Sequence, residues 1–197
     1  MTYVLGLTGS IGMGKSTTAR MFASESVPVW DADATVRMLY AKGGPAAHKV
    51  AQLYPDAMDR GAVSRDKLRG LIAQDPGILD HLQDIVHPLV AKDRADFLSV
   101  TTSPVVLLDI PLLFETGTDA VCDGVVVVTA SADEQRRRVL ERGEMSEADL
   151  NMILSRQMPD SEKRARADWV IETTSLDAAR HSVRDILQQI KGRQTDA

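Results

Sequence analysis

Residues 9–17, with the sequence GSIGMGKST, constrain this chain more than any other part of it. They match the pattern G-x-x-x-x-G-K-[ST] of a phosphate-binding loop. The surroundings agree with the pattern, because a short apolar run over 3–8 precedes the loop and a helical pattern over 16–23 follows it. The sequence therefore predicts a strand, a glycine-rich loop and a helix, in that order.

Each residue type in this loop suits a phosphate ligand for a physical reason. Gly9, Gly12 and Gly14 can adopt a positive φ, which lets the backbone close on a phosphate. The N–H groups at the start of the helix point at that phosphate, and the helix dipole aids them. Lys15 adds a cation for the β- and γ-phosphates, and the Ser16 hydroxyl is a ligand for Mg²⁺. The predicted nucleotide-binding residues of the loop are Ile11, Gly12, Met13, Gly14, Lys15, Ser16 and Thr17.

The alternative interpretation of the loop is a glycine-rich turn without a ligand. On the order of one chain in a hundred of this length would match the pattern by chance, given the average usage of glycine. The strand and helix on either side favour a nucleotide site heavily. The loop alone does not distinguish a kinase from a GTPase switch or an ATP-driven machine.

Length, charge and cysteine content exclude several classes of protein. With 197 residues the chain makes one domain. Its net charge of −5 argues against a nucleic-acid partner. Cys122 is the single cysteine and cannot form an internal disulfide, which suits a reducing cytosol. No apolar stretch approaches the ~20 residues of a membrane span. We therefore expect a cytoplasmic protein without a membrane partner, either a monomer or a weak homo-oligomer.

Two aspartates follow the second expected strand, which covers residues 27–30. Open α/β sheets bind ligands at the carboxyl ends of their strands, where Asp31 and Asp33 stand. The alternative is helix capping, since Asp33 precedes a helical pattern that includes Leu39. On the residues alone, capping and chemistry are equally supported.

Residues 43–100 have a different character from the strands on either side. Short helical patterns alternate there with turn signals, which predicts a helical insertion suited to a second substrate. Pro88 suits the first turn of a helix that runs to about Leu98. A histidine beside a proline is usually a structural hydrogen-bonding residue, so a substrate role for His87 is the minority interpretation.

The run over 105–108 predicts a strand that is buried on both faces and ends at Asp109. An acidic residue there occupies the Walker-B position and would support Mg²⁺. An apolar segment over 110–114 follows, and Glu115 comes after it. Core packing is one interpretation of this segment. The other is an apolar lining for an organic substrate, with Glu115 as its polar anchor.

The next expected strand, 125–128, leads into a helix that is rich in arginine. Ser131 and Glu134 form a capping box at the start of that helix. Arg138 and Arg142 are four residues apart and so share one helix face. Such arginines usually form a solvated face, but in a phosphate-transfer protein they can close on charge as a lid. A last strand over 169–171 and a final amphipathic helix complete the chain.

These motifs together resemble the dephospho-coenzyme A kinase family, and the resemblance covers nearly the whole chain. The aspartate pair with Arg37 and the segment over 111–115 are more specific than the loop, which many kinases share. The residues that carry the resemblance are the loop at 7–17, Asp31, Asp33, Arg37, His87, Pro88, the segment PLLFE at 111–115, Gln135, Arg138, Arg142, Gln157, Lys163, Ala167 and Asp168.

The family implies an α/β fold of the P-loop NTPase type. Its parallel five-stranded sheet is flanked by helices and carries a helical substrate-binding insertion and a helical lid. We expect a single kinase domain over 1–197, with a core of about 1–34, 101–133 and 167–197. The acceptor-binding subdomain is expected over about 35–100 and the lid over about 134–166.

The resemblance also implies an activity and its residues. The expected reaction is ATP- and Mg²⁺-dependent phosphorylation of the ribose 3′-hydroxyl of dephospho-coenzyme A, the last step of coenzyme A biosynthesis. The expected catalytic residues are Lys15, Asp33 and Arg138, and the expected metal ligands are Ser16 and Asp109. Arg142 joins the loop residues in binding ATP. The expected acceptor-binding residues are Asp33, Arg37, His87, Pro111, Leu113 and Glu115.

The chain departs from the family pattern at two places. Ser10 stands where the family often has glycine, which is harmless if Ser10 keeps a negative φ. Glu172 and Thr173 stand where the family tends to have an Asp-Asn pair, so a role in holding adenine is not carried over to them. The runner-up function is another small-molecule kinase, such as a nucleotide kinase. A P-loop regulatory switch is a different class, and the chain lacks the guanine-reading motif N-K-x-D.

Overall fold

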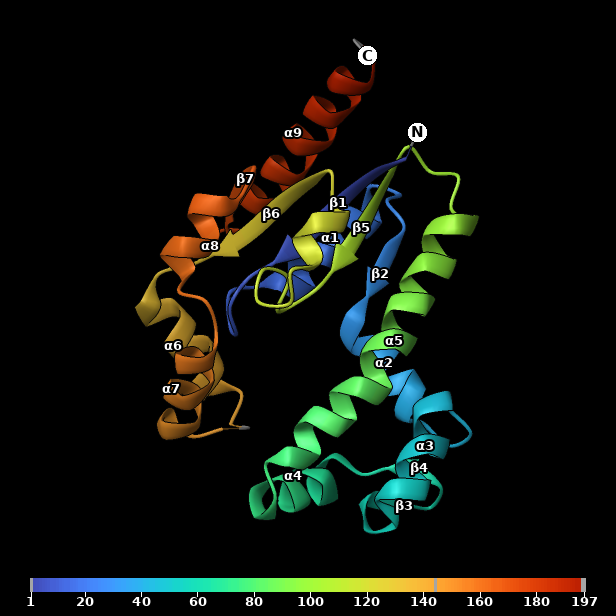
Figure 1. Ribbon diagram of the computed structural model, residues 1–197. Helices are drawn as coiled ribbons and strands as arrows, with labels where there is room; N and C mark the ends of the chain where they lie inside the picture. The colour runs from blue at the N-terminus through green and yellow to red at the C-terminus, as the bar shows by residue number, and fades with distance from the viewer. Residues whose placement is uncertain (1, 144, 196–197) are drawn as a thin grey trace. The chain divides into compact units, whose positions relative to one another are not determined.

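The computed structural model describes residues 2–143 and 145–195. The chain divides into two compact units (Figure 1). The sheet unit comprises Met1–Trp30 and Thr101–Ala197, and the helical unit comprises Asp31–Val100. The helical unit is therefore an insertion between two strands of the sheet.

The sheet has five strands in the order β2-β5-β1-β6-β7. Their bounds are Tyr3–Thr8 for β1, Val29–Asp31 for β2, Val105–Asp109 for β5, Gly124–Thr129 for β6 and Trp169–Glu172 for β7. Strand β1 pairs in parallel with β5 and β6, and β6 pairs in parallel with β7. Every residue of β5 and β6 is buried, as expected for parallel strands covered on both faces. The predicted fold class is confirmed.

Helices α1 (Lys15–Ser24) and α9 (Leu176–Thr195) contact each other and build the main core of the sheet unit. That core brings Phe22 of α1 and Val183 of α9 together with Leu107 of β5 and Val126 of β6. Three shorter helices lie between β6 and β7: α6 (Ala132–Glu141), α7 (Glu147–Arg156) and α8 (Asp160–Arg166). A 3₁₀ helix, η2, covers Thr118–Val121. Among the described residues, no helix is long and apolar enough to cross a membrane.

The helical unit has its own small apolar core. Its helices are α2 (Ala32–Tyr40), α3 (Pro45–Leu53), α4 (Arg65–Gln74) and α5 (Gly77–Val100), with the 3₁₀ helix η1 over Pro55–Ala57. Val50, Leu68 and Leu82 from three of these helices meet in that core. A two-stranded hairpin, β3 (Met58–Asp59) with β4 (Ala62–Val63), was absent from the sequence expectation. Its turn places Arg60 at φ 48° and Gly61 at φ 87°, as a tight hairpin requires.

The expectation that Pro88 begins a helix is wrong. Helix α5 is continuous from Gly77 to Val100 and contains Pro88 in its interior (Figure 1). Pro88 itself is exposed, while Val86 and Leu82 in the preceding turns are buried. Contacts of α5 with α2, α3 and α4 hold the helix together across the proline. Tertiary packing here outweighs the local preference for a break at proline.

Candidate active site

The phosphate loop joins β1 to α1 and uses its glycines in two different ways. Gly12 and Gly14 have φ of 77° and 88°, as expected. Gly9 is not among the residues with positive φ, so that expectation is wrong for it. A Cβ at Gly9 would lie 2.4 Å from Val128 Cγ2 and 2.8 Å from the Val128 carbonyl oxygen. Gly9 is therefore needed for close packing against β6. Ser10 also avoids positive φ, so its replacement of glycine carries no backbone strain.

The start of α1 presents free backbone donors. In the described part of the chain, the N–H groups of Gly12, Gly14, Lys15 and Ser16 donate to no protein acceptor. Buried or half-buried N–H groups normally find a partner, and a cluster of free ones at a helix start is an anion site. The Ser16 side chain is exposed at the same place.

The N–H groups of Ile11 and Met13, two of the predicted nucleotide-binding residues, are engaged within the protein. The Met13 N–H donates to the Ser10 carbonyl at 3.1 Å. The Ile11 N–H donates to Gln157 Oε1 at 3.4 Å, and the Ile11 carbonyl accepts from Gln135 Nε2 at 2.7 Å. Two glutamines from the segment between β6 and β7 thus hold the two peptide groups on either side of Ile11.

Lys15 and Asp109 form an ion pair at the carboxyl end of the central strands. Lys15 Nζ lies 2.6 Å from Asp109 Oδ1, and the two side chains are only 14% and 5% exposed. Asp109 ends β5, and β5 pairs with β1, the strand that leads into the loop. The parallel register therefore brings the expected Walker-B carboxylate to the loop lysine.

Arg138 is held by three hydrogen bonds. Its Nε donates to Glu134 Oε1 at 2.7 Å, one turn earlier on α6. Its two terminal nitrogens donate to Thr173 Oγ1 at 2.9 Å and to the Thr173 carbonyl at 2.6 Å. Hydrogen bonds from Arg137 and Arg138 lower the pKa of Glu134 to about 2, so this carboxylate is charged near neutral pH. Arg138 is thus oriented without any ligand.

Thr173 is a residue that sequence reasoning missed. Its hydroxyl lies 2.9 Å from the Met13 carbonyl of the loop and 3.2 Å from the Thr129 carbonyl of β6. A Cβ at Gly14 would come within 3.0 Å of the Thr173 side chain. Thr173 therefore connects Arg138 to the backbone of the phosphate loop. The departure from the family pattern at this position was its one signal in the sequence.

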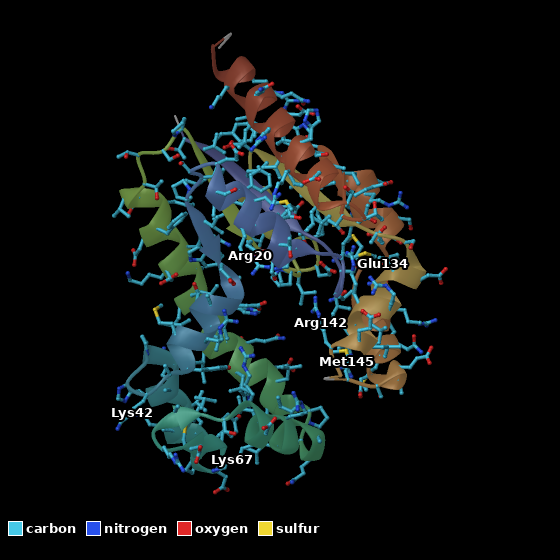
Figure 2. All side chains as sticks on the ribbon, turned by 180° about the vertical axis from the view of Figure 1, so that it is seen from behind. Arg20, Lys42, Lys67, Glu134, Arg142 and Met145 are labelled. Carbon is cyan, nitrogen blue, oxygen red and sulfur yellow. The ribbon has the colours of Figure 1, made fainter. Side chains whose placement is uncertain are left out.

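A cavity of about 220 Å³ opens beside the loop. Thr17, Met21 and Leu176 contribute to its lining, together with Arg138 and Arg142. Arg142 is the C-cap of α6 and is labelled in Figure 2. Within the chain as described, its guanidinium forms no ion pair or hydrogen bond. A cation that is free to bind an anionic or aromatic ligand thus lines the cavity at the loop.

The two aspartates after β2 have different surroundings. Asp31 is the N-cap of α2, since its Oδ1 accepts from the Ala34 N–H at 2.9 Å. Asp33 lies within the first turn of α2 and is exposed, and no described residue donates a hydrogen bond to its carboxylate. The helix begins at Ala32, earlier than expected, so the capping interpretation applies to Asp31 and not to Asp33.

The other expected acceptor residues of the helical unit are exposed as well. Arg37 follows one turn later on α2, with its terminal nitrogen 3.9 Å from Asp31 Oδ2. His87 is exposed in the middle of α5. Both side chains are accessible to a ligand.

The segment after β5 mainly packs within the sheet unit. Leu113 is fully buried and lies against Gly6, where a Cβ would be 3.0 Å from its Cδ2. The Pro111 carbonyl accepts from the Thr8 hydroxyl at 3.0 Å. Core packing is therefore the interpretation that the burial of Leu113 supports, and a substrate contact for Leu113 is not supported. Leu112, at 41% exposure, is the accessible apolar residue here.

Glu115, expected as a polar anchor for a substrate, binds protein groups through one carboxylate oxygen, and a substrate contact for it stays a prediction. Its Oε1 lies 2.9 Å from Lys163 Nζ and accepts from the Met158 N–H, also at 2.9 Å. Burial alone would raise the pKa of Glu115, but the contacts with Lys163 and Met158 outweigh it and lower that pKa below its usual value. Glu115 is therefore ionised at neutral pH.

Comparison with known proteins identifies the family. The model of the dephospho-CoA kinase family matches residues 3–178. The chain is similar to dephospho-CoA kinases from Jannaschia sp., at 59% identity over 96% of this chain and 98% of the relative, and from Cereibacter sphaeroides, at 57% identity over 95% of each.

Solved structures agree with the fold. The crystal structure of TT1252 from Thermus thermophilus aligns with a TM-score of 0.84 at 35% identity, covering 95% of this chain and 97% of that one. The dephospho-CoA kinase from Campylobacter jejuni has a TM-score of 0.71 at 21% identity, over 98% of this chain and all of that one. The family match over residues 3–178, together with a relative that is 59% identical over 96% of this chain, establishes that the chain belongs to the dephospho-CoA kinase family.

Proposed function

We propose that this chain transfers the γ-phosphoryl group of ATP to the ribose 3′-hydroxyl of dephospho-coenzyme A, giving coenzyme A and ADP, with the residue roles given below. Family membership carries the activity. The observation that carries the donor site is the cluster of free N–H groups at Gly12, Gly14, Lys15 and Ser16. Enzymes of this kind act mainly by positioning and by stabilising charge, so each role is one of geometry or electrostatics.

At the donor site, the free N–H groups bind oxygens of the β- and γ-phosphates. Lys15 places its ammonium on the same phosphates. Charge-assisted hydrogen bonds of this type are about twice as strong as neutral ones. The loop thereby fixes the phosphorus atom for in-line attack.

The residues next to the loop fit a magnesium ion. Ser16 offers a hydroxyl and Asp109 a carboxylate, which are the oxygen ligands that Mg²⁺ prefers. Among the described residues no group of three or more His, Cys, Asp or Glu side chains could hold a metal ion by itself, so a magnesium ion here would take most of its ligands from substrate phosphates and water. The ion would neutralise charge on the phosphates during transfer.

Arg138 and Arg142 neutralise charge on the transferring group. Arg138 is pre-oriented by Glu134 and Thr173, and Arg142 lines the cavity without an ion pair or hydrogen bond to any described residue. Donors that are already aimed at developing charge cost no reorganisation during the reaction. We assign transition-state stabilisation to Arg138 and nucleotide binding to Arg142.

Asp33 is the proposed base for the acceptor hydroxyl. Its carboxylate is exposed and makes no described hydrogen bond, so both oxygens are open to a substrate. A positioned carboxylate that accepts the hydroxyl proton contributes ~10²–10⁴ in rate. Arg37 and His87 are proposed to bind the acceptor, and residues of about 35–100 to form its subdomain.

One coupled assay tests this proposal. ADP release is measured with ATP and Mg²⁺ in the presence of dephospho-coenzyme A, AMP, other nucleosides or no acceptor. We expect release with dephospho-coenzyme A well above all the others, and its loss when EDTA removes the metal. Faster turnover with AMP would instead favour a nucleotide kinase, and release that needs no acceptor would indicate an ATPase or a switch.

A further inference from the structure

A fully buried lysine lies outside the set of residues to which the reaction assigns a role. Lys163, on α8, has a side chain with 0% exposure, and its Nζ is 2.9 Å from Glu115 Oε1. Apart from this ion pair, no acceptor in residues 2–143 and 145–195 meets the ammonium in hydrogen-bonding geometry. Removing an ammonium from water costs free energy, so this lysine is not explained by a contribution to stability.

The Glu115–Lys163 pair fixes one short segment, Gln157 to Asp160. The same Glu115 oxygen accepts from the Met158 N–H at 2.9 Å. At the other end of the segment, the Thr129 hydroxyl donates to Asp160 Oδ2 at 2.9 Å. The segment joins α7 to α8, and it is therefore held to the loop after β5 and to the end of β6.

The segment from Gln157 to Asp160 places the Gln157 side chain against the phosphate loop. Gln157 Oε1 accepts the Ile11 N–H at 3.4 Å, while Gln135 Nε2 donates to the Ile11 carbonyl at 2.7 Å. Gln135 is rigid because it lies on α6 with only 6% exposure. Gln157 instead depends on the position of its segment, since it is the C-cap of α7 and not part of a regular turn.

We propose that Glu115 and Lys163 are positioning residues for phosphoryl transfer, which act by seating the Gln157 carboxamide on the Ile11 N–H of the phosphate loop. The inference rests on the proposed phosphoryl-transfer function. It gives the buried charge pair a kinetic role: the pair sets where the loop peptide lies, and the loop peptide sets where the phosphate lies. A shift of about 1 Å at a reacting group can cost ~10²-fold in rate, so the position of this peptide matters.

Two single variants and one double variant separate the effect of the pair on kcat from its effect on stability. Glu115→Gln leaves the buried Lys163 ammonium without its counterion, and Lys163→Met leaves the Glu115 carboxylate, which is 18% exposed, without its cation. Both should unfold at lower temperature, and Glu115→Gln should lose more. The double variant Glu115→Gln with Lys163→Met leaves no unpaired charge and should recover much of the unfolding temperature. We expect kcat of all three to be about 10- to 100-fold below wild type, with little change in KM for ATP. A double variant that regains wild-type kcat together with its stability would overturn the proposal.

Gln157→Ala tests the contact on the loop directly and adds no buried charge. We expect it to lower kcat to a similar degree and to shift the Ile11 amide signal in the NMR spectrum. In the Gln157→Ala background, Glu115→Gln should have a much smaller effect on kcat than in the wild type, because the two act on one peptide. Wild-type kcat in Gln157→Ala would sink the proposal even if the pair variants fold poorly.

The matched control is Glu141→Gln, which makes the same chemical change at a glutamate of α6 that pairs with Arg137 on the surface. It should leave kcat and the Ile11 signal unchanged, and an equal loss of kcat in this control would also count against the proposal. The wild type serves as the reference for function. If the wild type releases no ADP in response to the acceptor, the proposed function itself is wrong. If the wild type turns over normally and the variants have the same kcat as the wild type, only the positioning role is wrong.

Discussion

Most of the charged side chains proposed to act in the sheet unit are held by protein partners, whereas those proposed to act in the helical unit are exposed. In the sheet unit, Lys15, Arg138 and Glu115 are each held at short distance by a protein partner. In the helical unit, Asp33 and His87 are exposed. This difference supports the proposal that the donor site is organised before any ligand binds, while the proposed acceptor residues gain their positions from the substrate. Preorganisation favours rate, while exposed groups retain freedom to adapt to a large acceptor.

The most severe test of the comparison is Lys15→Ala, in the preorganised unit. We expect a loss of turnover of about 10³–10⁵, similar to that for loss of other cations on a transferring phosphate. The variant also leaves Asp109, at 5% exposure, without its cation, which should cost about 1–3 kcal/mol of unfolding free energy. ADP release and thermal unfolding together check both effects. Turnover near the wild-type level in a folded variant would remove the loop from the mechanism.

Asp33→Asn tests the other unit. We expect kcat to fall by about 10²–10⁴ while ATP affinity and stability stay near wild type, because the carboxylate is exposed and unengaged in the described structure. Asp31→Asn is the matched control: asparagine still caps α2, so both rate and stability should persist. Equal kinetic effects at the two positions would contradict the different roles assigned to them.

Arg138→Ala sharpens the comparison within the sheet unit. Loss of one pre-oriented donor should lower kcat and kcat/KM together, by about 10²–10³. Its neighbour Arg137 provides the control, because it pairs with Glu134 and Glu141 at 54% exposure. Arg137→Ala should change neither parameter, since such surface pairs contribute little. A rise in the acceptor KM alone would make Arg138 a binding residue.

The smallest expected effect concerns two glycines. Gly70 lies inside α4 with open space around it, so Gly70→Ala should raise the free energy of unfolding by about 0.5–1 kcal/mol. Gly14→Ala should instead lower it, because φ is 88° and Thr173 lies within 3.0 Å of the added Cβ. Urea unfolding measures both changes. Stabilisation by Gly14→Ala would show that the loop geometry is not constrained as described.

The features predicted well from the sequence are those with local causes. The loop, its strand and helix and the placement of Asp109 follow from spacing and from runs of apolar residues. Asp31 and Asp33 could not be separated, because both are aspartates, which favour the N-cap, and a shift of two residues in the start of the helix decides which one caps it. The prediction at Pro88 was wrong because the contacts of α5 with α2, α3 and α4 outweigh the local preference of proline for a helix start.

The partners of Glu115 and Arg138 could not be predicted for a different reason. Lys163 and Thr173 are distant from them in the sequence, and only the folded chain brings each pair together. Family resemblance marked Glu115 and Lys163 separately but did not indicate that they touch. Sequence reasoning therefore found the charged residues of the donor site without the pairs into which the fold arranges them.

The ion pair between Lys15 and Asp109 has a consequence for which anions the loop accepts. Lys15 Nζ lies 2.6 Å from Asp109 Oδ1, so an anion that binds Lys15 would separate these two charges. Free phosphate or sulfate would leave Asp109 beside a negative group. A nucleotide bound with a magnesium ion would offer Lys15 a phosphate and Asp109 a cation at the same time. We therefore expect a nucleotide with its metal to compete better for this site than a bare inorganic anion.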